Sequence, residues 1–80
     1  MTNTKKVKIN KAIVFTPVVS SMIKEYARAN NDLALRLNNG SAYICKNVSD
    51  SVFNAFLKAS SKGKFFSTDL KNKFVVEAAE

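Results

Sequence analysis

The chain has 80 residues and a formal net charge of +7, with 13 lysines and arginines against 6 acidic residues. A chain this short forms one domain, because it cannot divide its apolar residues between two cores. Its single cysteine excludes an internal disulfide, the lack of histidine excludes a Cys/His zinc site, and an apolar content of 46% excludes disorder. We therefore expect no metal, no cofactor and no membrane segment, and self-association is an open route to extra stability.

The first seventeen residues are rich in lysine and contain the only proline, Pro17. Lysines that alternate with apolar residues indicate either a charged edge strand or a mobile arm, and a proline limits a strand to the edge of a sheet. The lysines are Lys5, Lys6, Lys8 and Lys11. We divide the chain into a basic arm or edge strand (1–17), one domain (18–76) and a fraying tail (77–80).

Three antiparallel strands are predicted in the middle of the chain, at residues 22–29, 33–37 and 41–48. In the second of these strands leucines occupy every other position, which is the period-two pattern of a half-buried strand. The pair Asn39-Gly40 follows it and is a strong signal for a hairpin. Together these segments predict an antiparallel β-meander.

An amphipathic helix is predicted after the meander. Ser49 is a good N-cap, and Gly63 suits the left-handed residue that ends a helix. Ser67 then caps a short helical turn, and residues 74–76 form a closing strand. The apolar face of the helix is formed by Val52, Phe53, Phe56 and Leu57. The expected fold is α+β: a three- to four-stranded antiparallel meander packed against one main helix, with a short helical turn and a C-terminal strand.

Several short stretches of the chain, in this order and spacing, resemble a known domain family. The stretches are Val19-Ser20-Ser21-Met22-Ile23, Leu33-Ala34-Leu35-Arg36-Leu37, Asn39-Gly40, Tyr43-Ile44-Cys45, Asn47-Val48-Ser49, Ala59-Ser60-Ser61-Lys62-Gly63-Lys64-Phe65-Phe66, Leu70 and Phe74. They resemble the KTSC domain, which is named for its occurrence at the C-terminus of some lysyl-tRNA synthetases and also stands alone as a small bacterial or phage protein.

The resemblance implies a small α+β fold, and the synthetase context suggests RNA binding. Two departures from the family pattern concern the central motif and the helix start. Cys45 stands where the family usually shows the second ring of Tyr-x-Tyr, so a stacking platform of two rings is halved. Ser49 replaces a proline at the helix start, which is structurally harmless.

The residue types needed for catalysis are not combined in this sequence. The commonest general base, histidine, is missing, and Cys45 lies in a predicted strand with no imidazole to activate it. Asp32, Asp50 and Asp69 suit turns and helix starts rather than a carboxylate pair. We therefore expect a binding protein and not an enzyme.

Two registers of the predicted hairpin place Tyr43 on different faces of the sheet. A two-residue turn pairs Arg36 with Tyr43 and points both away from the helix, where an arginine beside a ring could stack a base. A three-residue loop turns Tyr43 inward with the leucines. On the neighbouring strand Lys24, Tyr26 and Arg28 share one side in a regular strand and would widen such a surface.

Two functions are consistent with these features. The first is nucleic-acid binding, with RNA favoured, through a cationic surface with stacking tyrosines. The second is a protein-interaction module, a small bacterial or phage regulator that docks on a larger host protein. Either would work in the cytoplasm of a bacterial cell or a phage-infected host. The candidate nucleic-acid-binding residues are Tyr43, Arg36, Lys46, Lys24, Tyr26, Arg28, Lys62 and Lys64.

The stretch Lys62-Gly63-Lys64-Phe65-Phe66 permits two interpretations. It echoes the basic-glycine-aromatic pattern of RNA-recognition strands. It also reads as a glycine helix end followed by two core phenylalanines, with the lysines at the rim where they can reach phosphates. The second interpretation fits its position after a helix better.

Overall fold

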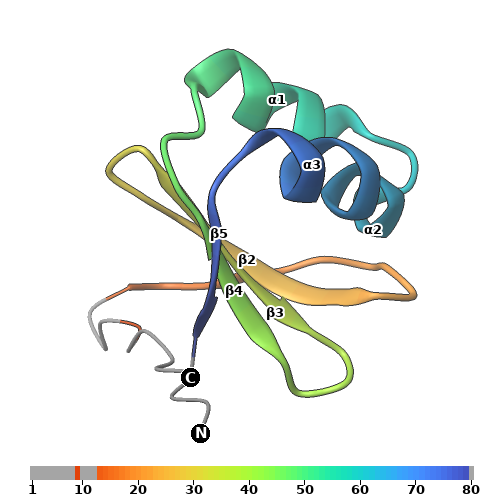
Figure 1. Ribbon diagram of the computed structural model, residues 1–80. Helices are drawn as coiled ribbons and strands as arrows, with labels where there is room; N and C mark the ends of the chain where they lie inside the picture. Colours follow the sequence, from red (N-terminus) through yellow and green to blue (C-terminus); the bar gives the residue numbers. More distant parts are fainter. Residues whose placement is uncertain (1–8, 10–12, 80) are drawn as a thin grey trace, which may run out of the picture.

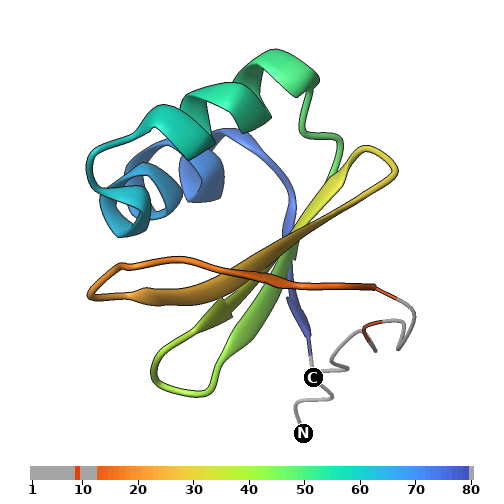
Figure 2. The same cartoon turned by 180° about the vertical axis from the view of Figure 1, so that it is seen from behind.

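The computed structural model describes residue 9 and residues 13–79, and these form one antiparallel sheet with all helices on one of its faces (Figure 1). The same two layers are seen from behind in Figure 2. The elements are β1 (Thr16–Pro17), β2 (Ile23–Ala29), β3 (Asp32–Leu37), β4 (Ala42–Cys45), α1 (Asp50–Lys58), α2 (Lys62–Phe65), a π-helical turn η1 (Phe66–Leu70), α3 (Lys71–Lys73) and β5 (Val76–Ala79). The predicted α+β class is confirmed.

The sheet has five strands in the order β1-β2-β3-β4-β5. The chain leaves the meander after β4, crosses the sheet as α1, α2, η1 and α3, and returns as β5 beside β4. The closing strand lies later in the chain than predicted, and Glu77 to Ala79, expected as a fraying tail, pair with β4. This pairing satisfies backbone groups on the outer edge of β4. The predicted arm lies largely outside the described residues, apart from β1, which pairs with β2 as an edge strand.

A three-residue loop joins β3 to β4. Gly40 has φ of +94°, its N–H donates to Leu37 O at 3.1 Å, and Leu37 N–H donates to Ser41 O at 2.7 Å. Both types of tight two-residue hairpin turn need positive φ at their first residue, and here Asn39 keeps negative φ. Leu35 therefore pairs with Tyr43, and of the two registers the one that turns Tyr43 inward is present.

A β-bulge at Lys24 changes the phase of β2. Ile23 pairs with Leu37 while Glu25 pairs with Arg36, so Lys24 is an extra residue on its strand. A bulge of this kind shifts the alternation of side chains by one position. Ile23 and Tyr26 consequently both pack against the hydrophobic core, although they would lie on opposite faces of a regular strand.

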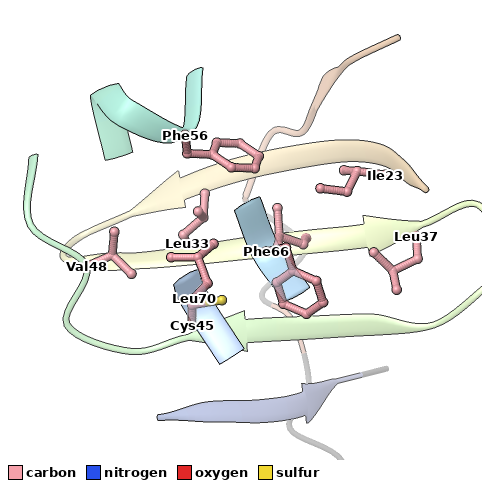
Figure 3. Packing of buried hydrophobic residues seen from close by; sticks show 9 residues of the cluster. Ile23, Leu33, Leu37, Cys45, Val48, Phe56, Phe66 and Leu70 are labelled. Carbon is pink, nitrogen blue, oxygen red and sulfur yellow. The ribbon is translucent and has the colours of Figure 1, made fainter. Parts of the chain in front are cut away.

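The core lies between the sheet and the helical layer. Phe56 of α1 and Phe66 of η1 lie over the sheet, in one buried cluster with leucines of β3 (Figure 3). Both phenylalanine side chains are essentially fully buried. The core residues are Ile23, Leu33, Leu35, Leu37, Cys45, Val48, Phe56, Phe66 and Leu70. Burial of this apolar set is the main force that holds the two layers together.

The helical layer is divided differently from the prediction. Ser49 caps α1 as expected, with its Oγ accepting from Val52 N–H at 3.3 Å. The helix ends at Lys58, however, and Ser61 caps the next helix through Lys64 N–H at 3.3 Å. Ser67 does not start a new turn; its hydroxyl donates to Gly63 O at 3.0 Å within a continuous helical backbone.

Gly63 is not the left-handed helix end that the sequence suggested. It lies buried inside α2, where a Cβ atom would stand 2.8 Å from Met22 Cβ and 3.0 Å from Met22 Sδ. A side chain at this position would therefore collide with the residue before β2. Glycine is required here for close packing, whereas Gly40 is required for its backbone conformation.

Alanine and asparagine should rank in opposite orders at the two glycines: asparagine is the more destabilising substitution at Gly63 and the less destabilising one at Gly40. Gly63→Ala should lower the free energy of unfolding by about 1–3 kcal/mol through overpacking, and Gly63→Asn by more. Gly40→Ala should cost about 1 kcal/mol through backbone strain, and Gly40→Asn less, because asparagine tolerates left-handed φ. Urea denaturation of the four variants measures this, and equal responses at both sites would contradict the assignment.

Candidate functional site

Arg28 of β2 faces the helical layer. Its Nη2 lies 2.9 Å from Asp50 Oδ1, and its guanidinium carbon lies 5.0 Å from the centre of the Phe53 ring. The other terminal nitrogen, Nη1, is buried without a hydrogen-bond partner in the part of the chain that the structure describes. Arg28 thus fastens α1 to the sheet and is largely committed to that contact.

Arg36 of β3 lies on the opposite face of the sheet and is also engaged. Its Nε lies 3.3 Å from Oε2 of Glu25, the residue paired with it on β2. The guanidinium carbon lies 4.8 Å from the centre of the Phe15 ring, which covers it from the side of β1. An ion pair and a ring on the same guanidinium leave it less free to stack a nucleotide base.

Lys46 forms the third ion pair, with its Nζ 2.9 Å from Asp32 Oδ2. Its donated hydrogen bond is the largest influence that lowers the pKa of the Asp32 carboxyl below the ordinary value, and the Asn47 N–H, donating at 3.2 Å, adds to it. The same bond raises the pKa of Lys46. The pair closes the start of β3 onto the end of β4.

Both tyrosines contribute to the packing between the sheet and the helices. The Tyr26 ring centre lies 5.9 Å from that of Phe53 and 5.8 Å from that of Phe56. Tyr43 lies 5.6 Å from Phe66 in the same way. Such distances are those of favourable aromatic pairs. One of the two registers considered from sequence placed Tyr43 outward as a stacking group, with Tyr26 on the neighbouring strand; both rings are instead half-buried against helices.

The predicted surface of Lys24, Tyr26 and Arg28 is not assembled. The bulge leaves Lys24 exposed, while the other two side chains turn to α1. The structure likewise separates Arg36 from Tyr43, which lie on opposite faces. The physical reason in each case is one residue of register, set by the bulge and by the three-residue loop.

Lysines of the helical layer differ from Arg28, Arg36 and Lys46, and resemble Lys24, in having no carboxylate partner within the described residues. We call Lys58, Lys62, Lys64, Lys71 and Lys73 the helical lysine set. No carboxylate within the described residues forms a salt bridge with any of them. Lys62 Nζ donates to Ala59 O at 3.3 Å, and Lys71 Nζ lies 5.9 Å from the centre of the Phe66 ring. Of the residues proposed from sequence, Lys62 and Lys64 belong to this set.

A hollow of about 480 Å³ lies at the end of the molecule where the segment before β2 meets the loop between α1 and α2. It is lined by Val19, Ser20, Ser21, Ser60, Ser61 and Lys62. Among these residues, the sequence indicated only Lys62 as a candidate binding residue. The two serine pairs are visible in the sequence, but they are about forty residues apart, so only the fold brings them together.

Other kinds of site find little support among the residues that the structure describes. They contain no group of three or more His, Cys, Asp and Glu side chains able to hold a metal ion. None of their helices is long and apolar enough to cross a membrane. Cys45 is completely buried, and burial is the main cause that raises the pKa of its thiol to about 12, with the Asp32 charge adding to it.

The five-stranded sheet and the helical layer agree with the comparisons with known proteins. Residues 19–74 match the profile of the KTSC domain. The chain belongs to the KTSC domain family. Two stretches of this KTSC domain, Val19–Ile23 and Ala59–Phe66, frame the hollow.

A solved relative has the same architecture. The crystal structure of a KTSC domain protein from Yersinia pestis is similar to this chain with a TM-score of 0.75 and 29% sequence identity. The alignment covers 86% of this chain and 100% of that one. A search of curated proteins finds no match.

The ion pair between Lys46 and Asp32 should make stability pH-dependent in acid. Because the pKa of Asp32 is lowered in the folded state, its contribution is present above the ordinary carboxyl value of about 4 and is lost as pH falls through the lowered value. Lys46→Gln should move the Asp32 pKa upward and weaken this dependence. Carboxyl NMR titration and urea denaturation from about pH 6 to pH 2 measure both effects. Lys24→Gln is the control and should change neither; an unchanged Asp32 pKa in Lys46→Gln would contradict the assignment.

The thiol of Cys45 should be inert in the folded protein. Only the thiolate reacts with aromatic disulfides, and both burial and the raised pKa suppress it. The native protein should therefore react with an aromatic disulfide reagent at pH 8 at the rate of global unfolding, and at once in urea. Fast reaction under native conditions would show that β4 opens locally.

Proposed function

We propose that this KTSC domain is a small, non-enzymatic module that binds nucleic acid, RNA in the first place, through the sugar–phosphate backbone. The observation that carries the proposal is the helical lysine set, which has no carboxylate partner within the described residues. Arg28, Arg36 and Lys46, in contrast, are each in an ion pair. Lysines without partners are those that release most counterions when phosphates approach.

The packing of the tyrosines favours contact with phosphates over contact with bases. Tyr26 and Tyr43 are half-buried against phenylalanines of the helical layer, so each ring offers less free surface to a base. Phosphate contacts give affinity and position but carry no sequence information. The module that we propose is accordingly tolerant of sequence and strongly dependent on salt.

The state of the reactive groups supports binding rather than catalysis. The Cys45 thiol is buried with a raised pKa, and Glu25, Asp32 and Asp50 are engaged by cations. A general base or nucleophile needs an accessible side chain with a pKa near the working pH. A buried thiol kept free is also compatible with the reducing cytoplasm of a bacterial cell or a phage-infected host, where we place this module.

A second candidate function is supported by the free edge of β5. This strand ends the sheet, so the outward N–H and C=O groups of Val76–Ala79 have no strand partner in the part of the chain that the structure describes. Neither lysine nor proline protects this edge, and Glu77 is its one charged residue. A larger host protein could add a strand there, which is the second function considered from the sequence.

Neutralising the helical lysines should weaken RNA binding. In the full-length chain, Lys58, Lys64, Lys71 and Lys73 are changed together to glutamine. Affinity for a labelled single-stranded RNA in low salt should fall about 10–100-fold, and the slope of log K against log salt should shrink by about 2–3. Fluorescence anisotropy at several salt concentrations measures both quantities.

The matched control also removes four positive charges, but from lysines near the N-terminus. Lys5, Lys6, Lys8 and Lys11 are changed together to glutamine, and binding should fall much less. Equal loss in the two variants would show that total charge, not the helical layer, governs binding. No binding of RNA or DNA at low salt would overturn the proposal, and recovery of one stoichiometric, nuclease-resistant protein partner would favour the β5 edge.

A further inference from the structure

The serine-lined hollow combines hydrogen-bond donors with one positive charge. Its lining residues are Val19, Ser20, Ser21, Ser60, Ser61 and Lys62, and Lys62 is the one charged residue among them. Its volume of about 480 Å³ lies in the range of small-ligand sites. An anion can therefore enter without meeting a lining carboxylate.

Two of the hydroxyls already use their oxygens as acceptors. Ser20 Oγ accepts from Met22 N–H at 3.2 Å and from Ile23 N–H at 3.1 Å. Ser61 Oγ accepts from Lys64 N–H at 3.3 Å. Each hydroxyl has one hydrogen to donate, and that hydrogen is not used in these bonds. Both serines are therefore held in place by the backbone and are left with a donor for a ligand.

The other two hydroxyls are available at the same place. Ser21 and Ser60 are exposed, and their hydroxyls form no hydrogen bond with another described residue. Lys62 lines the hollow as well, and its Nζ donates to Ala59 O at 3.3 Å. Four hydroxyls from two sides and one ammonium group are well suited to a tetrahedral oxyanion, which accepts several hydrogen bonds at once.

The two sides of the hollow are fixed relative to each other. Gly63 follows Lys62 directly, and its backbone approaches Met22 so closely that a Cβ would stand 2.8 Å from Met22 Cβ. Asn38 holds the other side, with its N–H donating to Met22 O at 2.8 Å and its Nδ2 donating to Ser20 O at 2.9 Å. In Figures 1 and 2 the loop before β2 and the loop after α1 lie at the same end of the molecule. Because packing and hydrogen bonds already hold both sides of the hollow in place, the site needs little reorganisation to bind an anion.

From these contacts we infer that the hollow binds one phosphate group of a nucleic-acid chain. The inference rests on the proposed function and gives it a specific point of attachment. Lys64 follows Lys62 by two residues and lines the neighbouring hollow with Ser60, Ser61 and one carboxylate, Asp69. The backbone of a bound strand that continues toward the helical lysine set would pass on the Lys64 side of this hollow. The hollow fixes one phosphate, and the lysines hold those next to it.

Inorganic phosphate tests the hollow without nucleic acid. Two-dimensional amide NMR of the full-length chain is recorded with phosphate and with chloride at matched ionic strength. Phosphate should shift the amide signals of Ser20, Ser21, Ser61, Lys62 and Gly63 in a saturable way, and chloride should not. Identical changes with both salts would overturn the inference.

Charge placed inside the hollow tests its use by RNA. Ser60→Asp should weaken binding of the labelled RNA about tenfold, because a carboxylate takes the place of a donor beside the phosphate. Asn54→Asp adds the same charge on the exposed face of α1 and should weaken binding by less than about threefold. Ser60→Asn introduces a side chain of the same size as Ser60→Asp but without the charge. It should weaken RNA binding by no more than Asn54→Asp does. If Ser60→Asp fails to fold, Lys62→Gln replaces it, with an expected loss of about threefold or more.

The results separate the two proposals. If wild-type protein binds RNA but Ser60→Asp binds it as well as Asn54→Asp does, the hollow is not the phosphate site and the proposed function stands. If phosphate shifts the hollow but neither RNA nor DNA binds, the proposed function and the nucleic-acid occupant both fail. In that case the phosphate belongs to another ligand, such as a phosphopeptide.

Discussion

The left-handed backbone of Gly40 decides which side of the sheet each residue of β4 occupies. With φ of +94° at this one residue, the loop takes three residues and Leu35 stands opposite Tyr43. Tyr43 and Cys45 therefore join the core with the leucines, and Phe66 gains a ring to pack on. Without this turn the helical layer would meet a different set of side chains.

The fold divides the positive charges between two roles. On the sheet, strand pairing brings Arg36 beside Glu25, and closure of β3 on β4 brings Lys46 beside Asp32. These cations stabilise the fold. The lysines of the helical layer have no such neighbours within the described residues and remain available to solvent and to ligands. Net charge alone does not reveal this division, because it counts both groups equally.

Local chemistry made part of the structure predictable from sequence. The alternating leucines predicted β3 and Ser49 predicted the start of α1, because each of these signals depends on only a few neighbouring residues. The bulge at Lys24 has no comparable local signal, and the Asn39-Gly40 pair is compatible with loops of two or three residues. One residue of register in each case decides a face of the sheet: the bulge separates Lys24 from Tyr26 and Arg28, and the loop length selects the inward face for Tyr43.

The serine-lined hollow was not predictable for a different reason. Its two halves are far apart in the chain, and each half has a plain local role as a turn or a helix cap. Gly63 was the available hint, and we interpreted it as a helix end because glycine is common there. Its actual role depends on Met22, a contact that only the tertiary structure creates.

The extra residue in β2 has a consequence for how this domain can vary. Because Lys24 sets the alternation of everything before it on the strand, loss of a single residue there would move Ile23 out of the core. Insertions and deletions among relatives should therefore be excluded from this strand.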